Sequence, residues 1–431
     1  MPHAIRVFAV FAAAHILSYF FRSANAVIAE DLRQALQLDP AQLGLMSSLF
    51  FGAFALSQLP FGALVDRFPA RVATPTLMLV GVVGSLAFAS AEGFGRLALG
   101  RALLGVGTAG ILMGGLKALS QLLPPKRFAR VSGMLVAVGS SGALIATAPL
   151  AHLAASFGWR GVFYGGAAAL LVSAATIAMV ARTPRAPAAV GALDESGALD
   201  SSGAPTAKGG GAGVMGGGAT SATAGFGRIF RSVAMWRMAG MAFALMGTTF
   251  AYQSLWAGPY LVEAAGMANL AAGNLLLFVG VGLILGFFTS GWVVERFGAA
   301  LVVAMAAVVN VAAQVGLAVL PTVAPPVVLG ALLFVFAASG AFSTQLYGQA
   351  TSVLPANLTG RAVTFVNLFM FLGGFALQWA IGVVVGAGAA TTDGASLVVA
   401  YRYAWLATSA LVLVALAFYL PLLRKDRPRS A

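Results

Sequence analysis

The sequence is poor in charge and has no cysteine. Of its 431 residues, 25 are Lys or Arg and 12 are Asp or Glu, so 9% are charged, where a soluble globular protein has about 25%. So few charges cannot cover a water-soluble protein of this size, which excludes an ordinary soluble enzyme, a disordered chain and a nucleic-acid-binding protein. Without cysteine there are no disulfides, no thiol catalysis and no cysteine-ligated metal. The three histidines are too few and too scattered for a metal site, and no cofactor is expected: His3, His15 and His152.

Apolar residues dominate what remains. They make up 60% of the chain, and the mean hydropathy is +0.93. A helix of about 20 apolar residues crosses a bilayer. The sequence predicts an all-α integral membrane protein with twelve such spans, at residues 7–29, 41–63, 72–91, 95–118, 131–154, 161–181, 238–262, 270–293, 299–320, 326–349, 361–387 and 398–422. The first run is too long for the apolar core of a cleavable signal peptide.

The segment between the sixth and seventh runs differs in composition. Residues 183–226 are mostly Gly, Ala, Ser, Thr and Pro. Such a segment buries too little apolar surface to offset its ordering entropy, so a flexible linker is expected. The predicted organisation is a six-helix bundle at residues 1–182, a cytoplasmic linker at 183–237, a second six-helix bundle at 238–422 and a basic tail at 423–431.

The basic residues indicate the orientation in the membrane. With the N-terminus inside, 18 of the 25 Lys and Arg residues fall on the cytoplasmic side and four on the outer side. Cytoplasmic loops carry the excess of Lys and Arg, so both termini are predicted to be cytoplasmic, in a plasma (inner) membrane. The net charge of +13 reflects this bias. The remaining three basic residues lie inside apolar runs: Arg22, Arg101 and Lys117.

The two halves of the chain resemble each other. Residues 62–68 (GALVDRF) follow the second run, and residues 291–297 (GWVVERF) follow the eighth. Residues 159–160 before the sixth run correspond to residues 401–402 before the twelfth. A repeat of six plus six helices is a transporter architecture in which the substrate site lies between the halves near the bilayer midplane.

The loop after the second run carries a family signature. Residues 62–71 (GALVDRFPAR) resemble G-x-L-x-D-R-x-G-R-R/K of the major facilitator superfamily, with Pro69 where the family usually has Gly. Residues 101–107 (RALLGVG) resemble the helix 4 signature of that family. The resemblance covers essentially the whole chain. It implies two pseudo-symmetric six-helix bundles that form a monomeric secondary transporter, not an enzyme.

Two arginine segments resemble particular members of that family. Residues 19–22 (YFFR) resemble the helix 1 arginine of organic-anion and phosphate-ester transporters, and residues 101–108 the helix 4 arginine segment of anion:cation symporters. Those symporters often have carboxylates where this chain has Phe21 and Thr108. The helix 5 antiporter signature is not matched either, which disfavours antiport. The resemblance therefore implies an organic-anion substrate and leaves the coupling proton or other ion open.

Polar residues line one face of the first run, at steps of 3, 1, 3 and 3: His15, Ser18, Tyr19, Arg22 and Asn25. An arginine within the bilayer costs at least roughly 2.5–3.5 kcal/mol and is therefore a functional candidate. Its guanidinium can hold a carboxylate or phosphate with two hydrogen bonds. The alternative for Arg22 is a structural role, capping backbone carbonyls. We predict substrate binding for Arg22 and Tyr19.

Two further buried groups have open roles. Arg101 either shares the anion site with Arg22 or hydrogen-bonds helix 1. His15 is the one mid-helix group that titrates near neutral pH, since all twelve acids fall in loops, the linker, the tail or helix ends. If transport is coupled to protons, His15 is the first candidate. The alternative is a neutral histidine hydrogen-bonded inside the bundle.

The second half has two polar-aromatic stripes, in the seventh and eleventh runs. Such faces suit a substrate cavity, although hydrogen bonds between helices would explain them too. The substrate-binding candidates on these stripes are Tyr252, Gln253, Trp256, Asn367 and Gln378.

Charged residues at the cytoplasmic ends of the second and eighth runs suggest a gate. They could pair across the halves in one state and separate in another, or they could mark topology only. The gating candidates are Asp66, Arg67, Arg71, Glu295 and Arg296.

The sequence thus predicts a secondary active or facilitative transporter of a small organic solute, with an anion such as a carboxylate favoured. Uptake is preferred over efflux. The partners expected are this solute and the lipid bilayer, with a coupling proton or other ion if transport is active. The alternative function is an exporter of apolar or cationic compounds.

Overall fold

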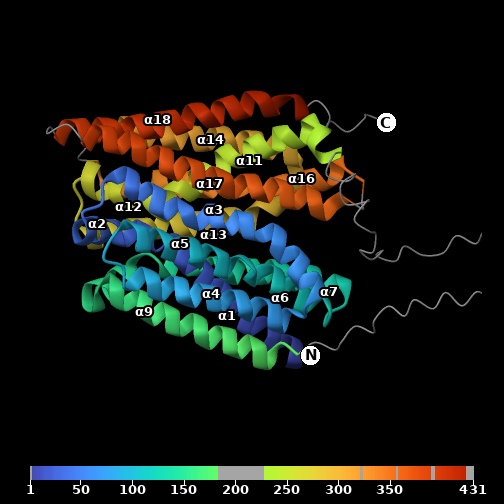
Figure 1. Ribbon diagram of the computed structural model, residues 1–431. Coiled ribbons are helices and arrows are strands. Elements are labelled where there is room, and N and C mark those ends of the chain that lie inside the picture. The colour runs from blue at the N-terminus through green and yellow to red at the C-terminus, as the bar shows by residue number, and fades with distance from the viewer. Residues whose placement is uncertain (1, 183–227, 321–323, 356–357, 390–393, 424–431) are drawn as a thin grey trace, which may run out of the picture.

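The computed structural model describes residues 2–182, 228–320, 324–355, 358–389 and 394–423. Within these ranges the chain is helical apart from short turns, and no strand occurs there (Figure 1). The linker predicted at residues 183–237 falls outside the described ranges up to residue 227, and so does nearly all of the predicted tail.

The N-terminal half contains the first six spans. Its elements are α1 (Pro2–Ser23), α2 (Asn25–Leu36), α3 (Pro40–Arg67), α4 (Ala70–Ala89), α5 (Phe94–Ala109), α6 (Ile111–Ser120), α7 (Pro125–Ser140), α8 (Gly142–Ile145) and α9 (Ala148–Val180). The fourth span is α5 continued by α6. The fifth span is α7, α8 and the first part of α9. Gly158, whose φ is 70°, interrupts α9 between the fifth and sixth spans, since a positive φ suits glycine.

The C-terminal half contains the other six spans. Its elements are α11 (Val233–Ala251), η1 (Tyr252–Trp256), α12 (Ala257–Pro259), η2 (Tyr260–Ala264), α13 (Asn269–Phe297), α14 (Ala299–Val319), α15 (Pro326–Ala341), η3 (Phe342–Thr344), α16 (Gln345–Val353), α17 (Thr359–Ala389), α18 (Gly394–Tyr419) and η5 (Leu420–Leu422).

The seventh span is the least regular. It begins at Val233, five residues before its predicted start, and contains two π-helical turns, η1 and η2. Pro259 lies between them. Proline lacks the amide hydrogen that the α-helical ladder needs and clashes with the preceding turn, which explains the wider turns here.

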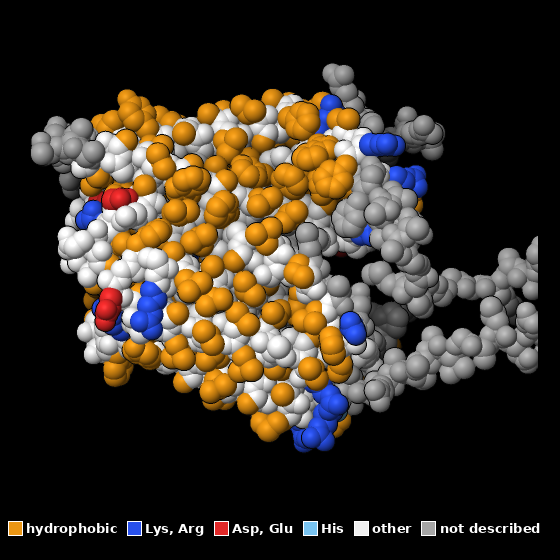
Figure 2. Space-filling view, viewed as in Figure 1, with side chains coloured by type: hydrophobic (Ala, Val, Ile, Leu, Met, Phe, Trp, Pro, Cys, Tyr) orange, Lys and Arg blue, Asp and Glu red, His pale blue; other side chains and the backbone are white. Residues whose placement is uncertain are grey.

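The length and composition of the helices support a multi-pass membrane protein. Among the described residues, ten helices are long and apolar enough to cross a membrane, and Val131–Ile145 is a shorter apolar helix. With the seventh span these make up the twelve that the sequence predicts. Figure 2 shows the same pattern on the surface, since apolar side chains cover the flank and charged side chains gather at its two ends.

The two halves lie side by side (Figure 1). α3 of the first half packs along α17 of the second, and α13 packs against α9. Both ends of the described chain lie at one end of the bundle, called here the termini side, and α2 and α12 lie at the other end, called the far side. The predicted orientation would make the far side the outer one.

The halves approach most closely near the far side. α3 starts with a capping box in which Asp39 Oδ1 accepts from the Gln42 amide at 2.7 Å, with Pro40 at the first helical position. One turn on, Gly44 faces Gly382 of α17. A Cβ added at Gly382 would lie 2.7 Å from the Pro40 carbonyl oxygen and 3.2 Å from Gly44 Cα. Only glycine permits two helix backbones to pack this closely.

Candidate functional site

Arg22, at the last turn of α1, lies among aromatic rings from both halves. Its side chain is buried, with 4% of the residue exposed. The guanidinium carbon is 4.5 Å from the Tyr19 ring centroid, 5.2 Å from Phe54, 5.3 Å from Phe250 and 5.1 Å from Phe371. In the described part of the chain no carboxylate lies within ion-pair distance of Arg22, and its Nε has no hydrogen-bond partner. Among the described residues, Arg22 is therefore a buried cation without a carboxylate partner, held by ring faces and by the nearby hydroxyls of Tyr19 and Tyr347.

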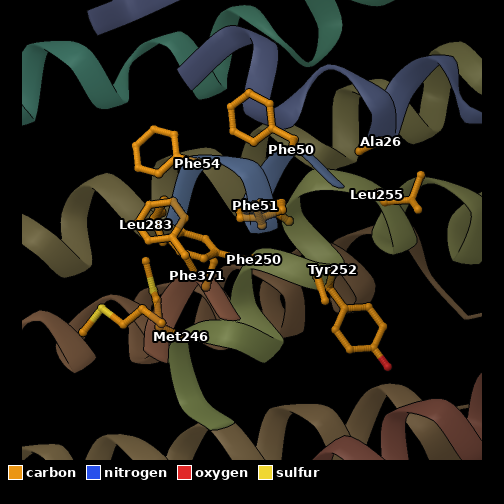
Figure 3. Close-up of a cluster of buried hydrophobic side chains, with 14 of the residues drawn as sticks. Ala26, Phe50, Phe51, Phe54, Met246, Phe250, Tyr252, Leu255, Leu283 and Phe371 are labelled. Atoms are coloured by element: carbon orange, nitrogen blue, oxygen red, sulfur yellow. The ribbon is translucent and has the colours of Figure 1, made fainter. Parts of the chain in front are cut away.

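The rings around Arg22 belong to one cluster, drawn in Figure 3. Phe54 of α3 stacks on Phe371 of α17, with centroids 4.3 Å apart and planes 14° apart. Phe250 of α11 lies 5.3 Å from Phe371 and 5.3 Å from Phe51. These four phenylalanines, two from each half, are called here the phenylalanine cluster. Because Arg22 and these rings are all buried, a ligand can reach the guanidinium only if side chains around it move.

The helix 1 face predicted from spacing is present. His15 packs edge-on against Tyr19, with centroids 5.2 Å apart, and Tyr19 in turn lies against Arg22. His15 is also buried, and neither ring nitrogen has a hydrogen-bond partner among the residues that the structure describes. It faces Gly139 of α7, where any side chain would collide with the imidazole. The structure thus brings His15, Tyr19 and Arg22 together.

A group of three hydrogen-bonded side chains lies next to Arg22, towards the termini side. Asn367 of α17 donates to Gln58 Oε1 of α3 at 2.6 Å. It also accepts from the Tyr347 hydroxyl of α16 at 2.5 Å. That hydroxyl is close enough to interact electrostatically with Arg22. Asn367 was predicted from the sequence, whereas Gln58 and Tyr347 were not, because no polar stripe was identified in their helices.

Arg101 of α5 lies behind helix 1 rather than in the cluster around Arg22. Its Nη1 donates to the Phe21 carbonyl at 2.7 Å, and its guanidinium lies 4.9 Å from the Phe50 ring centroid. The residue is fully buried. Of the two roles that the sequence left open, the bond to helix 1 is the one present.

Tyr252 points into the second half. Its ring stacks on Trp405 of α18, with centroids 3.5 Å apart and planes 2° apart, and meets Phe336 edge-on. In Figure 3 its hydroxyl points away from the phenylalanine cluster. Tyr252 therefore packs α11 and η1 against α15 and α18.

Two other predicted residues, Trp256 of η1 and Gln378 of α17, connect the seventh span to the eleventh. Trp256 Nε1 donates to the Gln378 carbonyl at 2.7 Å. The side-chain amide of Gln378 donates to Ser254 Oγ at 3.0 Å, and Gln378 Oε1 is buried with no partner in the described part of the chain. This is the interhelical hydrogen bonding that the stripes left open as an alternative.

Gln253 lies between the halves on the far side of the site. It lines a small cavity of about 10 Å³ with Ser23 and Ala26 of the first half and Gly280 of the second, close to the least space that holds one water. Within the described ranges, the Gln253 amide nitrogen and Ser23 Oγ are buried without hydrogen-bond partners. A single water could therefore join the two halves here.

The predicted gate residues lie at the termini side. Arg67, Arg71, Glu295 and Arg296 are exposed. Arg67 lies over the Phe68 ring, and Arg296 over the ring of Phe297. The side chain of Asp66 lies outside what the structure describes, and a gate at this end stays a prediction.

A charged contact between the halves exists at the far side. Arg33 of α2 donates to Glu30 at 3.1 Å, and its Nη1 lies 3.5 Å from Oε1 of Glu263 in η2. Glu263 also accepts from the Tyr401 hydroxyl of α18 at 2.8 Å. We call Arg33 and Glu263 the far-side latch. Sequence analysis missed it because both residues sit at helix ends, where charged residues are ordinary.

The far-side latch should contribute a small free energy to the closed state of the far side. Because the chain has no native cysteine, Ala26→Cys provides a single reporter beside the interface cavity. Glu263→Gln in this background should raise the rate of thiol labelling about two- to fivefold, the effect of a partly exposed pair worth about 0.5–1 kcal/mol.

The matched control for the latch is Arg402→Gln. Arg402 is also at the far side but donates to the Leu320 carbonyl within its own half, so labelling should not change. An equal rise in both variants would mean that the pair does not act between the halves.

Comparison with known proteins adds to this geometry. The family model described as Major Facilitator Superfamily matches residues 11–378. Among solved structures, a bacterial homologue of the human lysosomal transporter Spinster, in an inward-facing and unoccupied conformation, superposes with a TM-score of 0.77. It is 19% identical and covers 100% of both chains. At that identity the likeness concerns the fold.

Relatives among curated proteins match over shorter segments. A probable L-galactonate transporter of Escherichia coli (strain K12) is 27% identical over 150 residues, which are 35% of this chain and 33% of that protein. The MFS efflux transporter inpD of Emericella nidulans is 30% identical over 122 residues, 28% of this chain and 24% of that protein. The chain therefore spans about a third or less of these relatives in each alignment.

Proposed function

The chain belongs to the major facilitator superfamily of membrane transporters, and from this premise we propose that it carries a small organic anion, such as a carboxylate, across the membrane by alternating access. The observation that carries the proposal is Arg22. It is buried, has no carboxylate partner among the described residues, and lies between rings of both halves.

An uncompensated buried cation favours an anionic ligand. Burial without a counter-ion is costly for a charge, and a bound carboxylate would remove that cost through a bidentate pair. A neutral donor nearby, the Tyr19 hydroxyl, could complete the site. His15 adjoins this group and is our candidate for a coupling proton.

Alternating access follows from where the ligand would bind. Arg22 and Phe54 belong to the first half, whereas Phe250 and Phe371 belong to the second. A ligand at Arg22 would contact both halves, so the halves could enclose it while the site changes from one side of the membrane to the other. The latch and the Gly44 and Gly382 contact would close the far side, and the exposed charges at Arg67 and Arg296 would act at the other.

The orientation in the membrane, the direction of transport and the single-chain state are proposed from the sequence. The bias of Lys and Arg supports cytoplasmic termini in an inner membrane. We propose uptake, by a single chain. The L-galactonate relative supports an organic acid as substrate.

Export of apolar compounds is the second candidate function. The phenylalanine cluster and the efflux relative support it. Cationic compounds fit this alternative poorly, because Arg22 and Arg101 are the charges deep in the bundle and both are positive.

A thermal-shift panel on the full chain in detergent tests the proposal. A ligand at about 100 times its Kd stabilises the folded state by about 2.7 kcal/mol, which gives a measurable rise in Tm. We expect a rise with carboxylates and none with apolar cations. Rises confined to neutral or cationic apolar compounds would contradict the proposal.

A further inference from the structure

We infer that the anion carried has a flat aromatic body and a single carboxylate, in preference to a polyhydroxylated acid. This inference rests on the proposed function and specifies its substrate class. It comes from the side chains that surround Arg22 rather than from the charge of Arg22.

The surroundings of the guanidinium are rings. Phe54, Phe250 and Phe371 lie within 5.3 Å of the Arg22 guanidinium carbon, and Phe51 contacts two of them. Phe54 and Phe371 form a parallel stack that joins α3 to α17. A ligand whose carboxylate reaches Arg22 would therefore have these rings as near neighbours of its body.

The polar group that lies beside the rings towards the termini side is already engaged. Asn367 uses its amide nitrogen on Gln58 and its oxygen on Tyr347. A sugar acid brings several hydroxyls, and each one buried against phenylalanine without a partner weakens binding. Each hydroxyl group that the phenylalanine cluster leaves without a partner should therefore weaken binding further.

An aromatic body has the opposite effect. When a ligand parts Phe54 from Phe371, their stacking is lost unless the ligand provides a ring face in its place. A planar ring inserted there restores contact with both halves at once, while its carboxylate reaches the guanidinium that the same rings surround. The charge and the rings then recognise different ends of one small molecule.

Binding of two probes to the purified full chain tests this inference. Benzoate has one carboxylate on a flat ring, and D-glucuronate has one carboxylate on a hydroxylated ring. We expect benzoate to bind about tenfold or more tightly than D-glucuronate in a thermal-shift titration, since one unpaired hydroxyl costs about that factor. Phe371→Asn should reduce this ratio by giving hydroxyls a partner, whereas Phe371→Leu, which stays apolar, should weaken benzoate without helping D-glucuronate.

The outcomes separate the inference from the proposed function. If D-glucuronate binds as tightly as benzoate and Arg22→Gln abolishes both, the anion site stands and the aromatic substrate class is wrong. If neither carboxylate binds, or if Arg22→Gln binds both as the wild type does, the proposed function fails and the inference with it. The wild-type ratio decides the question even if a Phe371 variant does not fold.

Discussion

Arg22→Gln should abolish carboxylate binding while leaving the unliganded protein at least as stable as the wild type. Removing one partner of a buried, hydrogen-bonded charge pair costs about 2–5 kcal/mol of binding energy, which is roughly 30-fold to several thousand-fold in Kd. The unliganded state should gain, because Arg22 is buried beside rings with no acid near it among the described residues, and a neutral amide is cheaper to bury there. Thermal-shift titration measures both effects.

Arg101→Gln is the matched control. Both arginines are buried, and both substitutions remove one positive charge. Arg101, however, donates to the Phe21 carbonyl, so its loss should lower Tm by removing a bond between helices. The folded protein should still bind carboxylate with a Kd near that of the wild type. If Arg101→Gln lost binding and Arg22→Gln kept it, the roles assigned to the two arginines would be reversed.

Much of the fold follows from the sequence because the bilayer imposes it. Each span must satisfy its own backbone hydrogen bonds and present apolar side chains to lipid, so runs of hydrophobic residues mark the helices directly. The face shared by His15, Tyr19 and Arg22 was equally predictable, since α1 is regular at those positions. The family resemblance, carried by residues 62–71 and 101–107, is confirmed.

The seventh span shows where spacing fails. Its stripe was predicted from a period of 3.6 residues, but the π-turns around Pro259 widen the helix and rotate successive side chains away from that face. Tyr252 and Trp256 are four residues apart, so an α-helix would place them on one face, but Tyr252 stacks on Trp405 of α18 and Trp256 donates to Gln378 of α17. A proline in the run was the available signal.

The phenylalanine cluster could not be predicted for a different reason. The chain has 30 phenylalanines, and nothing local distinguishes Phe54 or Phe250 from a residue that packs a core. Their position around Arg22 depends on how two halves of the chain meet, and so does the bond between Gln58 and Asn367. Such contacts between distant segments become visible only in three dimensions.

Gly382→Leu should force the far side open. A Cβ at this position would already lie 2.7 Å from the Pro40 oxygen and 3.1 Å from the Trp256 ring, and the rest of the leucine has to displace α3 from α17. Overpacking of this kind costs about 1–3 kcal/mol, so a two-state equilibrium should shift towards the far-side-open state by roughly 5- to 150-fold. The Ala26→Cys reporter should then be labelled faster by a similar factor.

The control lies one turn further along the same helix. A Cβ at Gly386 would meet Ala41 only at 3.7 Å or more, an ordinary contact, and Gly386 is partly exposed. Gly386→Leu should therefore leave labelling near the wild-type rate. If the halves move as rigid bodies, opening the far side also separates Phe54 from Phe371, and we expect Gly382→Leu to change the affinity for benzoate as well. If α17 alone flexes, the labelling rate should rise while the affinity for benzoate stays the same. Unchanged labelling in Gly382→Leu would mean that the contact between Gly44 and Gly382 does not control access from that side.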